Sequence, residues 1–231
     1  MKTIKHLFFD LDHTLWDFEL NSQQVLSRLF NEHNLKEIFH LSEKEFISKY
    51  SEINADMWNR FHRNEISRDE LRVSRFGRTF QHFGIQSPEL EKIFPEKYLE
   101  FLPQQNRLFP DAYQVLDYLK QKYRLHLITN GFEKVQRSKL FHACLEPYFD
   151  VIVISELTGY KKPEPEIFQY AIIHAEANKE ESVMIGDDLT ADIEGALNFG
   201  MGAVFFNPAE KPFENPKAIQ IKELKELMNL F

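Results

Sequence analysis

Apolar and polar positions divide the chain into a helical segment and a segment in which strands and helices alternate. Residues 4–9 form a short apolar run that ends at Asp10 and predicts a buried strand. From about residue 18 to residue 104 the chain is polar and charged, and its apolar residues recur at helical spacing. Examples are Leu26, Leu29, Phe30, Met57, Trp58 and Phe61. This stretch is therefore predicted to be helical throughout.

From residue 108 onward the apolar pattern changes repeatedly between runs typical of a buried strand and the spacing of a helix. Strands are predicted over residues 124–129, 151–154, 183–185 and 202–206. Helices are predicted from apolar faces within residues 112–119, 135–140, 167–172 and 189–197, and a closing helix is predicted around residues 224–228. Such alternation predicts βα units and a parallel sheet that is buried on both faces.

The predicted order of elements implies an insertion. The first strand must join the later strands, because a lone strand leaves its backbone groups without partners. We therefore expect an α/β fold with a Rossmann-like parallel sheet core built from residues 1–17 and 105–231. Residues 18–104 are expected to form an inserted all-helical cap. A length of 231 residues is sufficient for a core with a smaller second unit.

Charge and composition exclude some classes of partner. The net charge of −8 argues against a nucleic-acid-binding surface, which normally needs a basic face. A single cysteine, Cys144, rules out an internal disulfide and fits a reducing compartment. No apolar stretch approaches the roughly 20 residues that span a bilayer. We expect a cytoplasmic protein without nucleic-acid or membrane partners, as a monomer or a weak homodimer.

Polar residues follow the predicted strands at four places. Asp10 and Asp12 come directly after the first strand. The later strands are followed by Thr129, Asn130 and Gly131, by Lys161 and Lys162, and by Asp187, Asp188 and Asp192. In an open parallel sheet, ligands bind outside the carboxyl ends of the strands. These residues are therefore expected to converge on one edge of the sheet.

The residue types at this edge predict a phosphate and metal site. Several close carboxylates repel one another unless a cation joins them, and oxygen-only ligands favour Mg²⁺ over zinc. Lys162 can balance a nucleophile and a phosphate oxygen. Residues 129–131 offer a hydroxyl, an amide and backbone N–H groups for an anion. Each cluster alone is an ordinary turn or helix entry, but their conjunction predicts a site for a small phosphorylated metabolite.

The motifs resemble those of the haloacid dehalogenase superfamily. The segment Asp10–Thr14, DLDHT, resembles its first motif, and Thr129 in LITNG resembles the second. Lys162 in GYKKPEPEIF resembles the third, and residues 186–192, GDDLTAD, resemble the acidic fourth. The helical insertion between the first and second motifs is similar to subfamily I. FFDLDHTLWDF, with TNG later, looks most like the pyrimidine 5′-nucleotidase branch.

The resemblance implies a role for each matching residue. Asp10 would attack phosphorus and form an aspartyl-phosphate, and Asp12 would act as general acid and then as general base. Thr129 would hydrogen-bond the transferred phosphoryl group. Lys162, which directly precedes the proline, would hold the nucleophile and the phosphate, and Lys161 is the weaker candidate.

The resemblance also implies Mg²⁺ as the cofactor. Its ligands would be Asp10, the backbone carbonyl of Asp12 and Asp187. The roles of Asp188 and Asp192 stay open, because the family varies in how its second acidic residue is placed.

These expectations converge on a Mg²⁺-dependent phosphatase for a small phosphomonoester, with a nucleoside 5′-monophosphate favoured. Trp16 lies close to Asp12 in the sequence and is expected to contact the leaving group. Trp58 and Phe61 are more readily explained as packing inside the cap. Phosphoglycolate, a sugar phosphate or pyrophosphate remain alternative substrates. A phosphomutase, a dehalogenase and a binding protein with an inactive site are weaker alternatives, and Asp12 argues against the dehalogenase.

Overall fold

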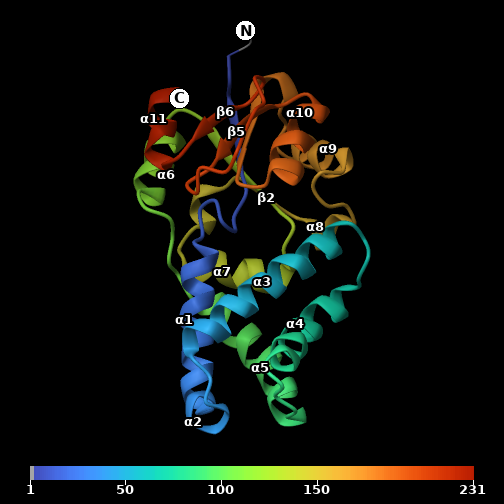
Figure 1. Ribbon diagram of the computed structural model, residues 1–231. Coiled ribbons are helices and arrows are strands. Elements are labelled where there is room, and N and C mark those ends of the chain that lie inside the picture. The colour runs from blue at the N-terminus through green and yellow to red at the C-terminus, as the bar shows by residue number, and fades with distance from the viewer. Residues whose placement is uncertain (1–2) are drawn as a thin grey trace. The chain divides into compact units, whose positions relative to one another are not determined.

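The computed structural model describes residues 3–231 and contains one parallel sheet in the order β3-β2-β1-β4-β5-β6 (Figure 1). Its strands are β1 (His6–Phe9), β2 (Arg124–Thr129), β3 (Val151–Ile154), β4 (Ser182–Gly186), β5 (Gly202–Phe206) and β6 (Ile219–Ile221). Every neighbouring pair is parallel. The predicted Rossmann-like fold class is confirmed.

The described chain divides into two compact units. The first, called here the core unit, comprises the described residues up to Glu19 together with Gln105–Phe231. Its helices are α6 (Ala112–Lys120), α7 (Glu133–His142), α8 (Ser155–Thr158), α9 (Pro165–His174), α10 (Gly195–Phe199) and α11 (Leu227–Leu230). In Figure 1, α9 and α10 lie on one side of the sheet and α6 and α11 on the other. Both faces of the sheet are thereby covered.

The second unit, Leu20–Gln104, is called here the helical unit. It contains most of α1 (Phe18–Glu32), then α2 (Leu35–Phe39), α3 (Glu43–His62), α4 (Arg68–His82) and α5 (Pro88–Phe101). Serine side chains at residues 42, 67 and 87 accept backbone N–H groups and start α3, α4 and α5. Its interior is aromatic and includes fully buried Phe46, Tyr50, Phe76, Phe80, Phe94 and Tyr98.

The helix predicted over residues 189–197 begins differently from a regular α-helix. The backbone carbonyl of Asp188 accepts N–H groups from both Asp192, at 3.0 Å, and Ile193, at 3.2 Å. These bonds widen the first turn into a short π-helix, Leu189–Glu194, before α10 begins. The wider turn brings the Asp192 side chain close to Gly186, as described below.

The carboxyl-terminal part of the chain also differs from the prediction. It contributes a sixth strand, β6, which the sequence pattern did not indicate because only Ile221 of its three residues is buried. The predicted closing helix consists of a 3-10 turn, Leu224–Glu226, followed by the short α11.

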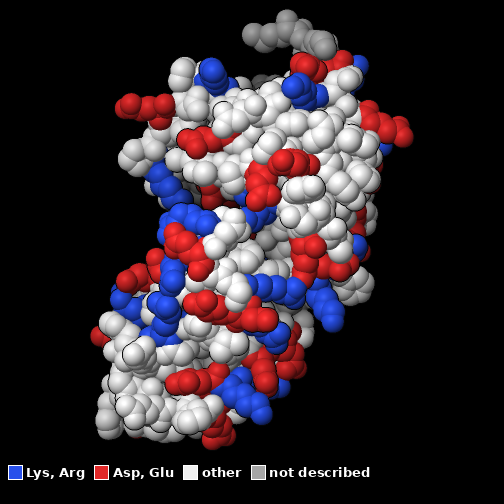
Figure 2. Space-filling view, turned by 90° about the vertical axis from the view of Figure 1, so that its right-hand side faces the viewer, with Lys and Arg blue, Asp and Glu red and all other residues white. Residues whose placement is uncertain are grey.

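The surface view agrees with the charge balance of the sequence. On the face shown in Figure 2, lysines and arginines are intermixed with aspartates and glutamates. Among residues 3–231, no helix is both long and apolar enough to cross a membrane.

Two histidines are buried side by side in the sheet. His6 Nδ1 lies 3.0 Å from His126 Nε2, and the Phe8 ring stacks on His126 with centroids 4.6 Å apart. Burial and the neighbouring His6 lower the pKa of His126 to about 4, and burial also lowers the pKa of His6. Both rings are therefore neutral in the folded protein near neutral pH.

Acidification should destabilise the protein through this pair. The unfolded chain binds a proton at His126 near its ordinary pKa of about 6.5, whereas the folded chain does so only near 4. The free energy of unfolding should therefore fall by about 3 kcal/mol as pH drops across that interval. His126→Gln, which does not titrate, should reduce this pH dependence in urea unfolding, whereas the exposed control His174→Gln should not. An unchanged dependence in His126→Gln would contradict the assignment.

Candidate active site

The strand order creates the site at the carboxyl end of the central strand. In the sheet, β2 and β3 lie on one side of β1, and β4 lies on its other side. The strand order therefore reverses between β1 and β4, and the carboxyl ends of these two strands border that point. Asp10 follows β1, and its backbone N–H donates to Ile185 in β4 at 2.9 Å. Asp187 follows β4 directly. The sheet thus sets these two carboxylates side by side.

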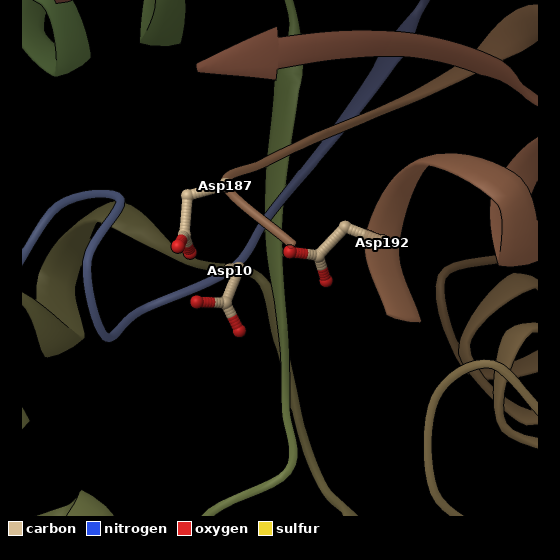
Figure 3. Close-up of side chains that lie close together, drawn as sticks. All are labelled: Asp10, Asp187 and Asp192. Carbon is tan, nitrogen blue, oxygen red and sulfur yellow. The ribbon is translucent and has the colours of Figure 1, made fainter. Parts of the chain in front are cut away.

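Asp192 completes a group of three carboxylates. Oxygens of Asp10, Asp187 and Asp192 lie within 4.8 Å of one another (Figure 3). The group requires a glycine at residue 186, because a Cβ there would lie 2.2 Å from Asp192 Oδ2. Asp188 is not part of the group. Its side chain caps the π-helix by accepting two backbone N–H groups, and its own N–H donates to Asp192 at 3.1 Å.

Lys162 is the cation within this acidic group. Its Nζ lies 2.5 Å from Asp10 Oδ1 and 2.6 Å from Asp192 Oδ1, and it donates to the Ile128 carbonyl at 2.8 Å. Lys162 is 2% exposed, whereas its neighbour Lys161 is half-buried. The sequence-based choice of Lys162 thus corresponds to the lysine that reaches Asp10.

Asn130 holds the Lys162 backbone in place. Its side-chain amide donates to the Lys162 carbonyl at 2.9 Å and accepts the Lys162 N–H at 2.8 Å. Both ends of the amide are therefore engaged. Asn130 was expected to bind substrate, but in this structure it anchors the loop that carries the lysine.

The buried charges perturb one another strongly. Burial raises the pKa of Asp10 to about 7, although Lys162 acts in the opposite direction. Burial and then the charges of Asp192 and Asp10 raise the pKa of Asp187. Burial alone would lower the pKa of Lys162, but the carboxylates of Asp10 and Asp192 outweigh it and raise the pKa. One buried ammonium does not neutralise three carboxylates.

The donor set fits a hard divalent cation. All three side chains offer oxygen ligands, and the pKa of each is raised, first by burial and then by the charges of neighbouring carboxylates. Oxygen-only sites of this kind suit Mg²⁺. The carboxylate of Asp12 is directed elsewhere.

Asp12 is held by two residues of α7 that the sequence analysis did not single out. Lys139 Nζ lies 2.6 Å from Asp12 Oδ1, and Gln136 Nε2 donates to Asp12 Oδ2 at 2.9 Å. Gln136 Nε2 also donates to the Thr129 hydroxyl oxygen at 2.7 Å. Gln136 and Lys139 are spaced i, i+3 on the helix that follows the Thr129 turn, which places both on one helix face. This i, i+3 spacing is the only feature of the sequence that could have pointed to these two residues.

Gly131 and Thr129 form the turn beside this helix. The Gly131 N–H donates to the Thr129 hydroxyl oxygen at 3.3 Å. A Cβ at Gly131 would lie 2.3 Å from the Gln136 side chain, so glycine is required for the close approach. The turn of residues 129–131 thus packs directly against Gln136.

Trp16 has no exposed surface and its indole N–H donates to the Gln105 carbonyl at 3.2 Å. The ring instead lies under Lys139, whose Nζ is 4.3 Å from the ring centroid. A ring without an exposed face cannot stack on a nucleobase in this structure. The expected contact between Trp16 and a leaving group is therefore not supported by its position.

Comparison with known proteins agrees with the fold and the motifs. A family model described as haloacid dehalogenase-like hydrolase matches residues 4–200. The chain is 34% identical over 206 residues to the pyrimidine 5′-nucleotidase PynA of Streptococcus pneumoniae, across 88% of this chain and 84% of that protein. It is 28% identical to the pyrimidine 5′-nucleotidase YjjG of Escherichia coli, across 97% of this chain and 96% of that protein.

A solved structure is similar over almost the whole chain. The crystal structure of the HAD-hydrolase YfnB from Bacillus subtilis bound to magnesium has a TM-score of 0.88 and 30% sequence identity, and covers 99% of both chains. That structure is described as revealing interdomain movement.

Mg²⁺ should bind this protein more weakly as the pH falls through about 7, because the ion must then displace a proton from Asp10. Below that pH, each unit should weaken binding about tenfold per proton displaced. Titration calorimetry with MgCl₂ at about pH 6 and about pH 8 measures the difference. Asp187→Asn should weaken binding at both, whereas Asp150→Asn, which removes an exposed carboxylate paired with Arg124, should change neither. Affinity independent of pH would contradict this account.

Proposed function

Because the chain belongs to the haloacid dehalogenase-like hydrolase family, we propose that it is a Mg²⁺-dependent phosphatase in which Asp10 is the nucleophile. The observation that carries the proposal is the contact of Asp10 Oδ1 with the buried Lys162 ammonium, beside two further carboxylates at the end of the central strand. The proposed reaction needs an oxygen to attack phosphorus, a cation beside it and carboxylates to hold a metal, and these are the groups that we assign to those roles.

The first half of the reaction transfers the phosphoryl group to Asp10. A carboxylate oxygen of Asp10 forms a bond to phosphorus as the bond to the leaving oxygen breaks, which gives an aspartyl-phosphate. Lys162 holds the nucleophile and offsets negative charge on the phosphoryl oxygens. The Thr129 hydroxyl donates to one of those oxygens.

Asp12 moves the protons. Its acid form gives a proton to the leaving oxygen and becomes a carboxylate. That carboxylate then takes a proton from the water that attacks the phosphorus of the aspartyl-phosphate. Asp10 is released as a carboxylate, inorganic phosphate leaves, and Asp12 is again an acid, so each turnover consumes one water molecule.

The carboxylates of Asp10, Asp187 and Asp192, with the backbone carbonyl of Asp12, are the groups we assign to Mg²⁺. When bound, the ion would stabilise the negative charge of the phosphoryl oxygens. The presence of Asp12 together with the three acidic residues favours hydrolysis of a phosphate ester over the removal of a halide.

The substrate we favour is a nucleoside 5′-monophosphate. The relatives PynA and YjjG are named pyrimidine 5′-nucleotidases, and both match the chain over most of its length.

We further propose that the helical unit acts as a cap that contacts the leaving group. We take Trp58 and Phe61 on α3 as the side chains that would contact the base, because both residues are half-buried and their rings pack edge to face at 5.7 Å. Partly exposed aromatic faces can stack on a base.

Asp10→Asn should abolish Mg²⁺-dependent hydrolysis of p-nitrophenyl phosphate without unfolding the protein, because an amide oxygen is a poor nucleophile. Lys162 retains its contact with Asp192 in this variant, so the buried ammonium keeps one partner. Release of p-nitrophenol and circular dichroism provide the two measurements. Asp150→Asn is the matched control and should retain full activity. Hydrolysis by a folded Asp10→Asn protein at the wild-type rate would refute the mechanism.

The wild-type protein should show a higher kcat/KM for pyrimidine nucleoside 5′-monophosphates than for phosphoglycolate, sugar phosphates or pyrophosphate. Trp58→Leu should raise KM for the nucleotides about tenfold, as expected for loss of one stacking contact worth about 1–3 kcal/mol. Phe83→Leu removes a half-buried ring elsewhere in the helical unit and serves as the control. If a non-nucleotide substrate ranks first, the nucleotidase assignment fails and the phosphatase assignment stands.

A further inference from the structure

The side chain of Asp12 is restrained at both of its carboxylate oxygens. Lys139 contacts Oδ1 at 2.6 Å and Gln136 donates to Oδ2 at 2.9 Å. Lys139 is 2% exposed and Gln136 is fully buried, so neither contact is made by a mobile surface side chain. Each carboxylate oxygen keeps a second lone pair, which leaves Asp12 free to exchange a proton.

Lys139 is itself held by aromatic rings. Its Nζ lies 4.3 Å from the centroid of the Trp16 ring and 5.5 Å from that of Phe18. Trp16 is fixed by full burial and by its hydrogen bond to the Gln105 carbonyl. Cation–π contacts of this kind stabilise a buried ammonium in one position.

Gln136 links Asp12 to Thr129. Its Nε2 donates to Asp12 Oδ2 and also to the Thr129 hydroxyl oxygen, so both amide hydrogens are used. Asp12 as a carboxylate can only accept, which fixes the orientation of the amide. The Thr129 oxygen also accepts from the Gly131 N–H, so the hydroxyl proton of Thr129 is available to a bound anion.

We propose that Gln136 and Lys139 are positioning residues that hold Asp12 in the orientation needed to protonate the leaving oxygen. The proposal rests on the phosphatase function given above. As the leaving oxygen takes the proton from Asp12, the new carboxylate forms between the Lys139 ammonium and the Gln136 amide. The contacts that orient the acid also stabilise the charge that it acquires.

Leaving groups of different acidity test the proposal. Phenyl phosphate and p-nitrophenyl phosphate have similar shapes, but phenoxide needs protonation far more than p-nitrophenoxide does. Lys139→Met preserves side-chain length and removes the cation. It should lower kcat/KM for phenyl phosphate about tenfold more than for p-nitrophenyl phosphate, within the contribution of general acid catalysis. Lys134→Met removes an exposed lysine from the same helix and should change neither value.

A double-mutant cycle identifies the residue through which Lys139 acts. In an Asp12→Asn background, Lys139→Met should alter the ratio of the two kcat/KM values by less than about twofold, because the acid is already absent. A ratio that still changes about tenfold in that background would overturn the assignment to Asp12.

Gln136→Met provides a second variant if Lys139→Met does not fold. It should also lower kcat/KM for phenyl phosphate more than for p-nitrophenyl phosphate, whereas a purely structural role would lower both equally. Equal losses in the folded variants would overturn this inference and leave the phosphatase function intact. Failure of the wild-type protein to hydrolyse either compound would overturn the function itself, and this inference with it.

Discussion

The site depends on the compensation of buried negative charge. Asp10, Asp187 and Asp192 have carboxylate oxygens within 4.8 Å of one another, and Lys162 supplies the ammonium that contacts two of these residues. Burial makes every unpaired charge there costly, because a carboxylate loses its hydration when water is excluded. Burial raises the pKa of all three carboxylates, and repulsion from neighbouring carboxylates raises it further. A cation bound among these carboxylates would relieve that repulsion.

The surrounding fold maintains that charge arrangement. The neighbouring strands β1 and β4 fix Asp10 beside Asp187, and the wide first turn after Asp188 turns Asp192 toward Gly186, where a larger residue would clash. Asn130 fixes the lysine loop through two backbone hydrogen bonds. On the adjoining helix α7, Gln136 and Lys139 hold the Asp12 carboxylate, which is not one of the three grouped carboxylates. The same sheet edge therefore carries two separate polar groups: the three acidic residues with Lys162, and Asp12 with Gln136 and Lys139.

The sequence pattern was sufficient to predict the fold class. It also predicted that the acidic residues, Thr129 and Lys162 lie at one edge of the sheet, because each follows a strand and parallel strands end at a common edge. It could not predict contacts that depend on side-chain direction. The two amide bonds of Asn130 and the burial of Trp16 under Lys139 depend on packing between distant segments. Gln136 and Lys139 carry no motif of their own, and β6 is too short to show a period.

The most direct test of the central claim is the capture of the covalent intermediate on Asp10. Wild-type protein would be mixed with excess p-nitrophenyl phosphate and MgCl₂, quenched in acid during turnover, and digested for mass spectrometry. The account predicts one phosphoryl group on the peptide that contains Asp10, and none on that peptide from Asp10→Asn protein treated in the same way. Active turnover with a phosphoryl group on another residue, or with none on any peptide across repeated quench times, would contradict the account.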